Sequence, residues 1–180
     1  AVANGIVNLK RHIENLKKYN FPVVVALNKF DSDTQEEFDV IFNACKELGA
    51  QCALATHWKD GGKGAVELAK AVLDVLDDNQ ESKFTPIYAN ELSLKDKIEM
   101  LAREIYRAGS VVYSRQAERQ LAELVEQGYN NLPVCISKTQ YSFSADPTLL
   151  GAPDGFELPV RELRLSAGAG FIVPMTGEII

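Results

Sequence analysis

The sequence has 180 residues, of which 46% are hydrophobic and 24% charged, a balance typical of a soluble globular protein with a sizeable core. No apolar run approaches the roughly 20 residues that span a bilayer, so we expect no membrane partner. Nineteen basic against 25 acidic residues give a net charge of −6, which argues against nucleic acid as a partner because such surfaces need clustered Lys and Arg.

The cysteines indicate the redox compartment. Cys45, Cys52 and Cys135 are odd in number, form no metal-binding motif and have apolar neighbours, which predicts buried thiols in a reducing, cytoplasmic location. No Cys/His set has the spacing of zinc ligands, so we expect no metal site. Because the chain starts inside a helical pattern and stops directly after a strand-like run, we expect it to be a fragment of a longer protein.

The first half of the chain alternates helices and strands. A helix is predicted from about Asn4 to Tyr19, followed by the strand Pro22–Leu27, which is apolar throughout, as in a central strand covered by helices on both faces. Asp33, with Glu36 three residues later, predicts the capped start of a helix that Gly49 ends.

A second strand–loop–helix unit follows. The strand Cys52–Ala55 leads through Thr56-His57-Trp58 and a glycine-rich turn, Gly61–Gly64, into a helix from Val66. Residues 77–83 are polar, and they are the candidate joint between a first part, 1–76, and a second α/β part, 84–180.

The second half continues the alternation and then loses it. The pattern predicts, in order, a helix capped by Ser93, the strand Val111–Tyr113, a helix from Ser114 to Gly128, the strand Val134–Ile136, and two strands, Val160–Leu165 and Phe171–Val173. Residues 138–158 show no pattern, and a loop of this length is more often functional than idle. The whole predicts an α/β fold with a mostly parallel sheet flanked by helices.

Two loops are the candidates for ligand binding. In open α/β sheets ligands bind beyond the carboxyl ends of the strands, and Phe30 and Trp58 follow two such ends. If the strands are neighbours, the two rings could grip a flat ring between them, with stacking worth roughly 1 kcal/mol per pair. The alternative is that Trp58 belongs to the core and Phe30 only plugs its loop.

A second hypothesis is a GTPase-like nucleotide-binding domain. Asn28-Lys29-x-Asp31 after an apolar strand is similar to the guanine-specificity motif, in which the Asp accepts hydrogen bonds from the base. No G-x-x-x-x-G-K-[ST] phosphate loop is present to support it. A third hypothesis is a non-catalytic α/β interaction module.

Two glycine-rich segments each have two interpretations. Gly61–Gly64 is either a flexible helix entry or a cluster of amides that holds a carboxylate or phosphate. The segment Ser166-Ala167-Gly168-Ala169-Gly170 either brings its backbone close to a ligand or forms a plain hairpin turn.

Four blocks of sequence span nearly the whole chain: Asn28-Lys29-Phe30-x-x-Asp33-Thr34, Thr56-His57-Trp58-x-x-Gly61-Gly62-x-Gly64, Lys138-Thr139-Gln140-Tyr141-Ser142 and Val160-Arg161-Glu162-Leu163-Arg164-Leu165-Ser166-Ala167-Gly168. Together and in this order they resemble the C-terminal part of the formate–tetrahydrofolate ligase family. The resemblance implies a fragment of a P-loop NTPase-like ligase with a C-terminal α/β portion.

The resemblance also implies a reaction and its ligands. The family ligates formate to tetrahydrofolate at the expense of ATP, through formyl phosphate, and gives 10-formyltetrahydrofolate, ADP and phosphate. The implied small molecules are formate, tetrahydrofolate and ATP with magnesium, together with a monovalent cation, and the implied assembly of the full-length enzyme is a homo-oligomer.

Site residues follow from the same resemblance. The folate would lie between Phe30 and Trp58, with Leu54 alongside, and the nucleotide near Ser166, Ala167, Gly168, Ala169 and Gly170. The family's P-loop and the residues that hold formyl phosphate belong to its N-terminal part. We therefore assign no catalytic residue here and expect this fragment to be inactive alone.

Overall fold

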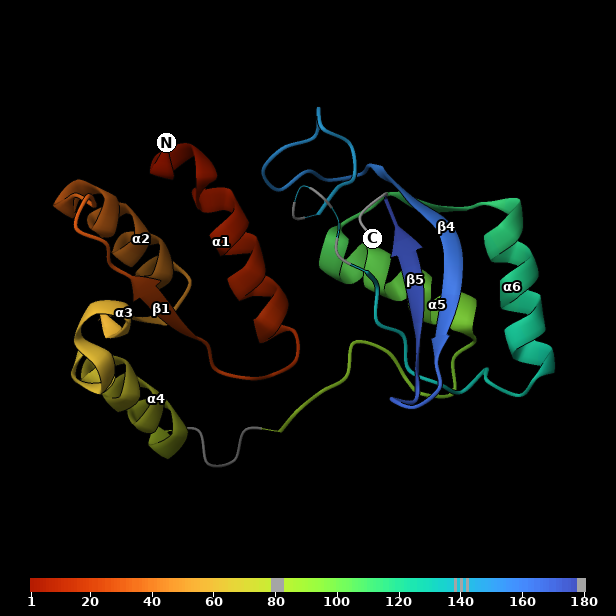
Figure 1. Ribbon diagram of the computed structural model, residues 1–180, viewed down its shortest axis with the longest axis horizontal. Helices are drawn as coiled ribbons and strands as arrows, with labels where there is room; N and C mark the ends of the chain where they lie inside the picture. Colours follow the sequence, from red (N-terminus) through yellow and green to blue (C-terminus); the bar gives the residue numbers. More distant parts are fainter. Residues whose placement is uncertain (79–82, 138, 140, 142, 178–180) are drawn as a thin grey trace. The chain divides into compact units, whose positions relative to one another are not determined.

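The structure is a computed structural model in which residues 1–78, 83–137, 139, 141 and 143–177 are described. The chain divides into two compact units, Ala1–Thr85 (unit 1) and Pro86–Ile180 (unit 2), and each is considered by itself (Figure 1). The predicted joint at 77–83 falls largely on residues 79–82, which lie outside the described residues; the division between the units comes directly after Thr85.

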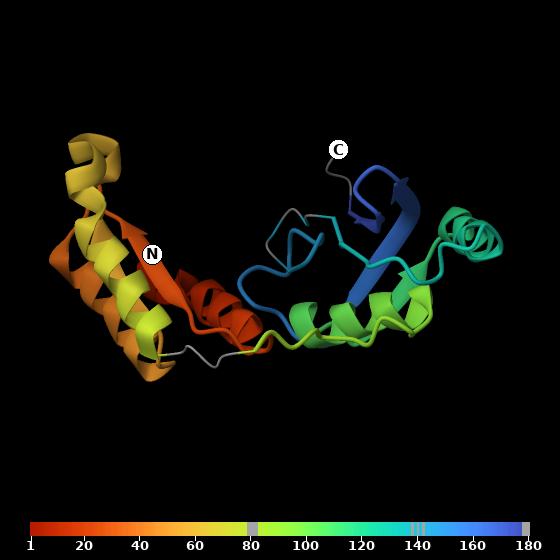
Figure 2. The ribbon, with the colours of Figure 1, turned by 90° about the horizontal axis from the view of Figure 1, so that it is seen from below.

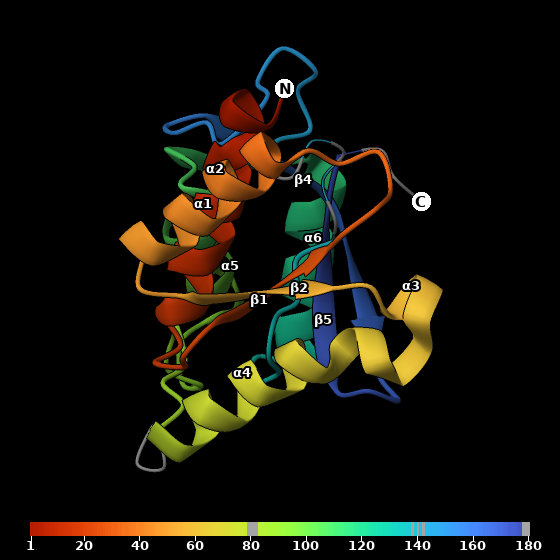
Figure 3. The same cartoon turned by 90° about the vertical axis from the view of Figure 1, so that its left-hand side faces the viewer.

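Unit 1 is built on two parallel strands. Its elements are α1 (Val2–Lys17), β1 (Val24–Asn28), α2 (Gln35–Glu47), β2 (Gln51–Ala55), α3 (His57–Asp60), the 3₁₀ helix η1 (Gly61–Ala65) and α4 (Val66–Asp78). β1 and β2 pair in parallel, with Leu27 opposite Leu54. Helices α1 and α2 lie over one face of this pair and α4 over the other (Figures 1 and 3).

The core of unit 1 lies between α1, α2 and one face of the strands. Ile13, Val23, Cys45 and Ala50 are its buried members. The predicted strand Pro22–Leu27 does form, as β1, but among the described residues it lies at the edge of a two-stranded sheet and not at the centre of a larger one. In the part of the chain that the structure describes, β1 pairs only with β2, and Ala26 on it is exposed.

The start of α2 differs from the prediction by one residue. Thr34 is the N-cap: its hydroxyl accepts from the Glu37 amide, and the Glu37 carboxylate accepts from the Thr34 amide in return. Asp33 is occupied elsewhere, because its carboxylate accepts a 2.7 Å hydrogen bond from the Phe30 amide. The predicted capping box is therefore real but uses Thr34 and Glu37.

Unit 2 holds a mixed three-stranded sheet. Its elements are α5 (Leu94–Leu101), the π-helical turn η2 (Ala102–Tyr106), β3 (Ser110–Tyr113), α6 (Arg115–Glu126), β4 (Glu157–Ser166) and β5 (Phe171–Thr176). β3 runs parallel to β4, and β4 forms an antiparallel hairpin with β5. Helix α5 lies against one face of this hairpin (Figures 1 and 2).

Residues from both helices and all three strands meet in the main core of unit 2, which is centred on Leu94, Ile98, Leu163 and Ile172. The predicted caps are confirmed, since Ser93 and Ser114 each accept a hydrogen bond from the amide three residues later. The α/β class is confirmed in both units.

Three local predictions are wrong. Val134–Ile136 is not a strand but a single bridge from Val134 to Ile172, although neighbouring amides also donate to β5 carbonyls. Cys135 within it is exposed rather than buried, while Cys45 is buried and Cys52 half-buried. The turn predicted at Gly61–Gly64 is the 3₁₀ helix η1. Within the described residues, no helix is both long and apolar enough to cross a membrane.

Candidate functional site

The loops that follow β1 and β2 meet at one end of unit 1. Because the strands are parallel neighbours, with Asn28 opposite Ala55, their carboxyl ends lie together. The Phe30 and Trp58 rings stack there, with centroids 5.4 Å apart and an interplanar angle of 24°. The side chains are 50% and 49% exposed, so the alternative that Trp58 belongs to the core is wrong.

The stacked pair is held by hydrogen bonds from both loops. The Trp58 indole N–H donates to the Lys29 carbonyl at 2.7 Å, which ties the α3 loop to the β1 loop. Lys59 and Asp31 form a 2.9 Å ion pair between the same two loops, and this contact raises the pKa of Lys59. The arrangement thus fixes the Trp58 ring against the end of β1.

The two rings touch each other and leave no gap for a third ring. A flat ligand sandwiched between two aromatic rings needs about 7 Å between them, because each contact requires roughly 3.5 Å. The observed separation is 5.4 Å, so a ligand between the rings would require them to separate by roughly 2 Å. The exposed outer faces of the rings can accept a flat ligand without such a movement.

Gly64 packs against the start of the Trp58 loop, a role that the sequence analysis did not predict. Its carbonyl accepts from the Thr56 amide at 2.9 Å. A Cβ at Gly64 would lie 2.5 Å from the Thr56 carbonyl carbon and 2.7 Å from the His57 nitrogen, so only glycine allows this approach. Gly64 is therefore a packed support of the loop, while a Cβ added at Gly61 or Gly62 would meet nothing within 4 Å.

Leu54, the third predicted folate residue, lies on β2 just before this end of the strand. It pairs with Leu27 of β1 and is half-buried. The predicted folate residues thus come from β2 and from the loops after both strands of unit 1.

The predicted nucleotide residues lie in unit 2, as the turn of the β4–β5 hairpin. Ala169 and Gly170 donate from their amides to the Ser166 carbonyl, and Gly170 has a φ of 72°. Ala167, Gly168 and Ala169 are exposed at the tip, and a Cβ on Gly168 would meet nothing within 4 Å. Of the third block of residues singled out in the sequence, Lys138, Gln140 and Ser142 lie outside the described residues, whereas Thr139 is buried.

The guanine-binding hypothesis finds no support in the loop after β1. Asp31 is already paired with Lys59, and the Lys29 ammonium lies over the Phe38 ring, 5.5 Å from its centroid. Over the residues that are described, no cluster of three or more His, Cys, Asp or Glu side chains could hold a metal ion.

Comparison with known proteins adds an independent result. The family model for formate–tetrahydrofolate ligase matches residues 1–180. A curated formate–tetrahydrofolate ligase from Maricaulis maris (strain MCS10) is 53% identical over 180 residues, which is 100% of this chain and 32% of that relative. The chain therefore spans about a third of the length of the curated relative.

Proposed function

This chain belongs to the formate–tetrahydrofolate ligase family, and from that premise we propose that it supplies the tetrahydrofolate-binding part of an ATP-dependent ligase. The proposed reaction joins formate to tetrahydrofolate and gives 10-formyltetrahydrofolate, ADP and phosphate. Formate is a poor acyl donor until one of its oxygens becomes a phosphate leaving group, so formyl phosphate is the proposed intermediate. Water must be kept away from it while the folate nitrogen attacks.

The observation that carries the proposal is the aromatic pair at the carboxyl ends of β1 and β2. The pterin of tetrahydrofolate has a flat pyrimidine ring, and Phe30 and Trp58 present half-exposed ring faces at the position where α/β sheets bind ligands. Stacking on such a face contributes about 0.5–1.5 kcal/mol beyond the burial of area. Leu54 is proposed as the apolar contact alongside.

The nucleotide side of the reaction is assigned to unit 2 and to the rest of the enzyme. We place the base of ATP near the turn Ser166–Gly170, whose exposed backbone allows a close approach. The phosphate loop is missing from these 180 residues, so the contacts to the ATP phosphates, magnesium and a monovalent cation are assigned to the remainder of a family-length chain. A cytoplasmic, homo-oligomeric enzyme completes the proposal, and the 180-residue chain alone should show no turnover.

A fluorescence titration tests the folate site. Trp58 is the only tryptophan, so its emission reports on the site directly. Tetrahydrofolate should quench it and guanine nucleotide should not. Phe30→Ala should weaken binding about five- to tenfold, the equivalent of roughly 1–1.5 kcal/mol of lost stacking, whereas Phe30→Tyr keeps a ring face and should bind like the parent. Equal affinities for Phe30→Ala and Phe30→Tyr would remove the support for the site.

A second experiment separates the nucleotide from the folate assignment. The space around Gly168 is open, so the fold can accept a larger side chain there. In a family-length enzyme, Gly168→Val should raise the KM for ATP, because the new side chain would lie where the base is proposed to bind. The KM for tetrahydrofolate should stay unchanged. An unchanged KM for ATP would exclude the turn as part of the nucleotide site.

A further inference from the structure

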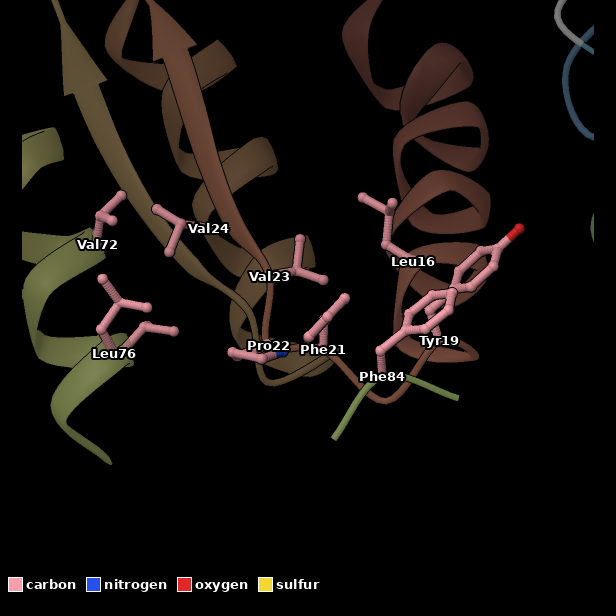
Figure 4. A pocket seen from close by; sticks show the side chains of 10 residues that line it. Leu16, Tyr19, Phe21, Pro22, Val23, Val24, Val72, Leu76 and Phe84 are labelled. Carbon is pink, nitrogen blue, oxygen red and sulfur yellow. The ribbon is translucent and has the colours of Figure 1, made fainter. Parts of the chain in front are cut away.

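An apolar groove lies at the end of β1 opposite to the aromatic pair. We call it the β1 groove, and it has a volume of about 630 Å³. Its lining comes from α1, β1, α4 and the segments before β1 and after α4 (Figure 4). Leu16 and Leu76 are 52% and 59% exposed within it, and Phe84 stacks on Tyr19 at its margin. Large apolar side chains gathered on one surface mark a place that another segment covers.

The groove lies at the start of a strand edge that is unpaired among the described residues, and Val24 is the β1 residue that lines it. The Gln51 amide donates to the Val23 carbonyl and the Lys29 amide to the Ala55 carbonyl, so the odd-numbered residues of β1 bond to β2. In a parallel ladder the bonding direction alternates along the strand. The N–H groups of Val24, Ala26 and Asn28 therefore point away from β2, toward an edge that has no partner among the described residues.

Apolar side chains line both sides of this edge. Val24 lies near Val72 and Leu76 of α4, and Val23 lies on the side of Leu16 from α1 (Figure 4). A strand pairing with β1 would send alternate side chains toward α4 and toward α1. Since both directions are apolar at the groove, the part of the strand that docks there is apolar on both faces, like the start of β1 itself.

A strand before α1 would fit the same edge. Helices α1 and α2 pack on one face, and α2 connects β1 to β2. Crossovers between parallel strands are right-handed in about 98% of cases. If α1 is also a crossover helix, a right-handed connection on this face requires the strand before α1 to lie beside β1, on the side away from β2.

From these observations we infer that the β1 groove is the docking site of an apolar β-strand supplied by the segment that precedes α1 in a family-length chain, paired in parallel with β1. The chain covers 32% of its curated relative, so a family-length chain holds further residues that can supply that strand. A second copy of this chain fits less well, because a two-fold axis at the edge would pair the two β1 strands antiparallel. The inference does not depend on the proposed ligand sites.

Amide hydrogen exchange on the family-length protein tests the pairing. Val25 and Leu27, which bond to β2, are the internal controls and should be protected. Val24, Ala26 and Asn28 should be equally protected there, and they should exchange much faster in the 180-residue chain. Free exchange at these three amides in the family-length protein would overturn the inference. Protection of these amides that depends on the concentration of the family-length protein would also overturn it, in favour of a second copy.

A pair of variants tests the groove itself. Leu76 lines it and Leu73 does not, although both lie on α4 and are 59% exposed. In the family-length protein, Leu76→Lys should lower Tm by several degrees more than Leu73→Lys, because the new charge would lie against the docked strand. Equal shifts in Tm would count against docking in the groove.

Discussion

Replacing Gly64 by alanine tests how the Trp58 loop is held in place. The added Cβ would lie 2.5 Å from the Thr56 carbonyl carbon, 2.6 Å from its hydroxyl and 2.7 Å from the His57 nitrogen. Ordinary contacts begin near 3.4 Å, so the loop or η1 must move by roughly 1 Å. Most of these atoms belong to the main chain and cannot rotate away, so the start of α3 would move with them.

The energetic balance can be estimated against a control. Overpacking of this kind costs about 1–3 kcal/mol, while glycine-to-alanine replacement by itself stabilises by about 0.4–1 kcal/mol at a compatible position. A Cβ added at Gly62, in the same 3₁₀ helix, would meet nothing within 4 Å, so Gly62→Ala shows only the second effect. Gly64→Ala should therefore be less stable than Gly62→Ala by about 1–3 kcal/mol.

Two assays measure the effect. Urea unfolding followed by Trp58 fluorescence gives the free energy of unfolding, and steady-state kinetics of the family-length enzyme gives the KM for tetrahydrofolate. Because Trp58 lies only two residues from Thr56, Gly64→Ala should raise that KM while Gly62→Ala leaves it unchanged. If the two variants have the same stability and the same KM, the reasoning about Gly64 is refuted.

Further predictions concern thiols, a buried amine and a helix cap. Cys135 should react with a thiol reagent at pH 8 well before Cys52, whose pKa burial raises to about 12 with help from the Cys45 thiol; equal rates would contradict this. Lys97 is fully buried and donates to two main-chain carbonyls, so Lys97→Met should lower the free energy of unfolding by about 1–3 kcal/mol. Burial also lowers the pKa of Lys97, so the unfolded chain holds this proton more tightly than the folded one. As the pH rises toward 10.5, the parent should therefore gain stability relative to Lys97→Met. Stability profiles that stay parallel over this pH range would contradict the prediction. Thr34→Ala should cost about 1 kcal/mol in urea unfolding, and no change would exclude the cap.

The elements of both units can largely be predicted from the sequence because their signals are local. Ser93 and Ser114 are followed by helical periodicity, and the structure places both as N-caps. The N-cap of α2 is harder to locate because two acceptors, Asp33 and Thr34, stand side by side. Only the structure shows that the Asp33 carboxylate accepts a hydrogen bond from the Phe30 amide and that Thr34 is the N-cap.

Features that depend on distant contacts cannot be read from the pattern. The apolar run of β1 indicates cover on all sides, but the pattern does not say which segment supplies it. Cys135 lies in an apolar triplet that resembles a strand, yet its neighbourhood forms one bridge and leaves the thiol exposed. Short apolar runs predict extended backbone without predicting a partner strand.

The candidate site is predictable in its position and not in its geometry. Parallel neighbouring strands bring their following loops together, so Phe30 and Trp58 are expected at one end of the sheet. Their 5.4 Å contact depends on the hydrogen bond from the indole to the Lys29 carbonyl and on the close approach of Gly64. Neither interaction has a signature in residue spacing.

The most direct test of the folate assignment is the steady-state kinetics of Phe30→Ala, with Phe30→Tyr as the matched control, in a family-length enzyme. The proposal predicts that the KM for tetrahydrofolate rises about five- to tenfold in Phe30→Ala alone and that the KM for ATP stays constant in both variants. A KM for tetrahydrofolate that is unchanged in Phe30→Ala, or that rises together with the KM for ATP, would contradict it.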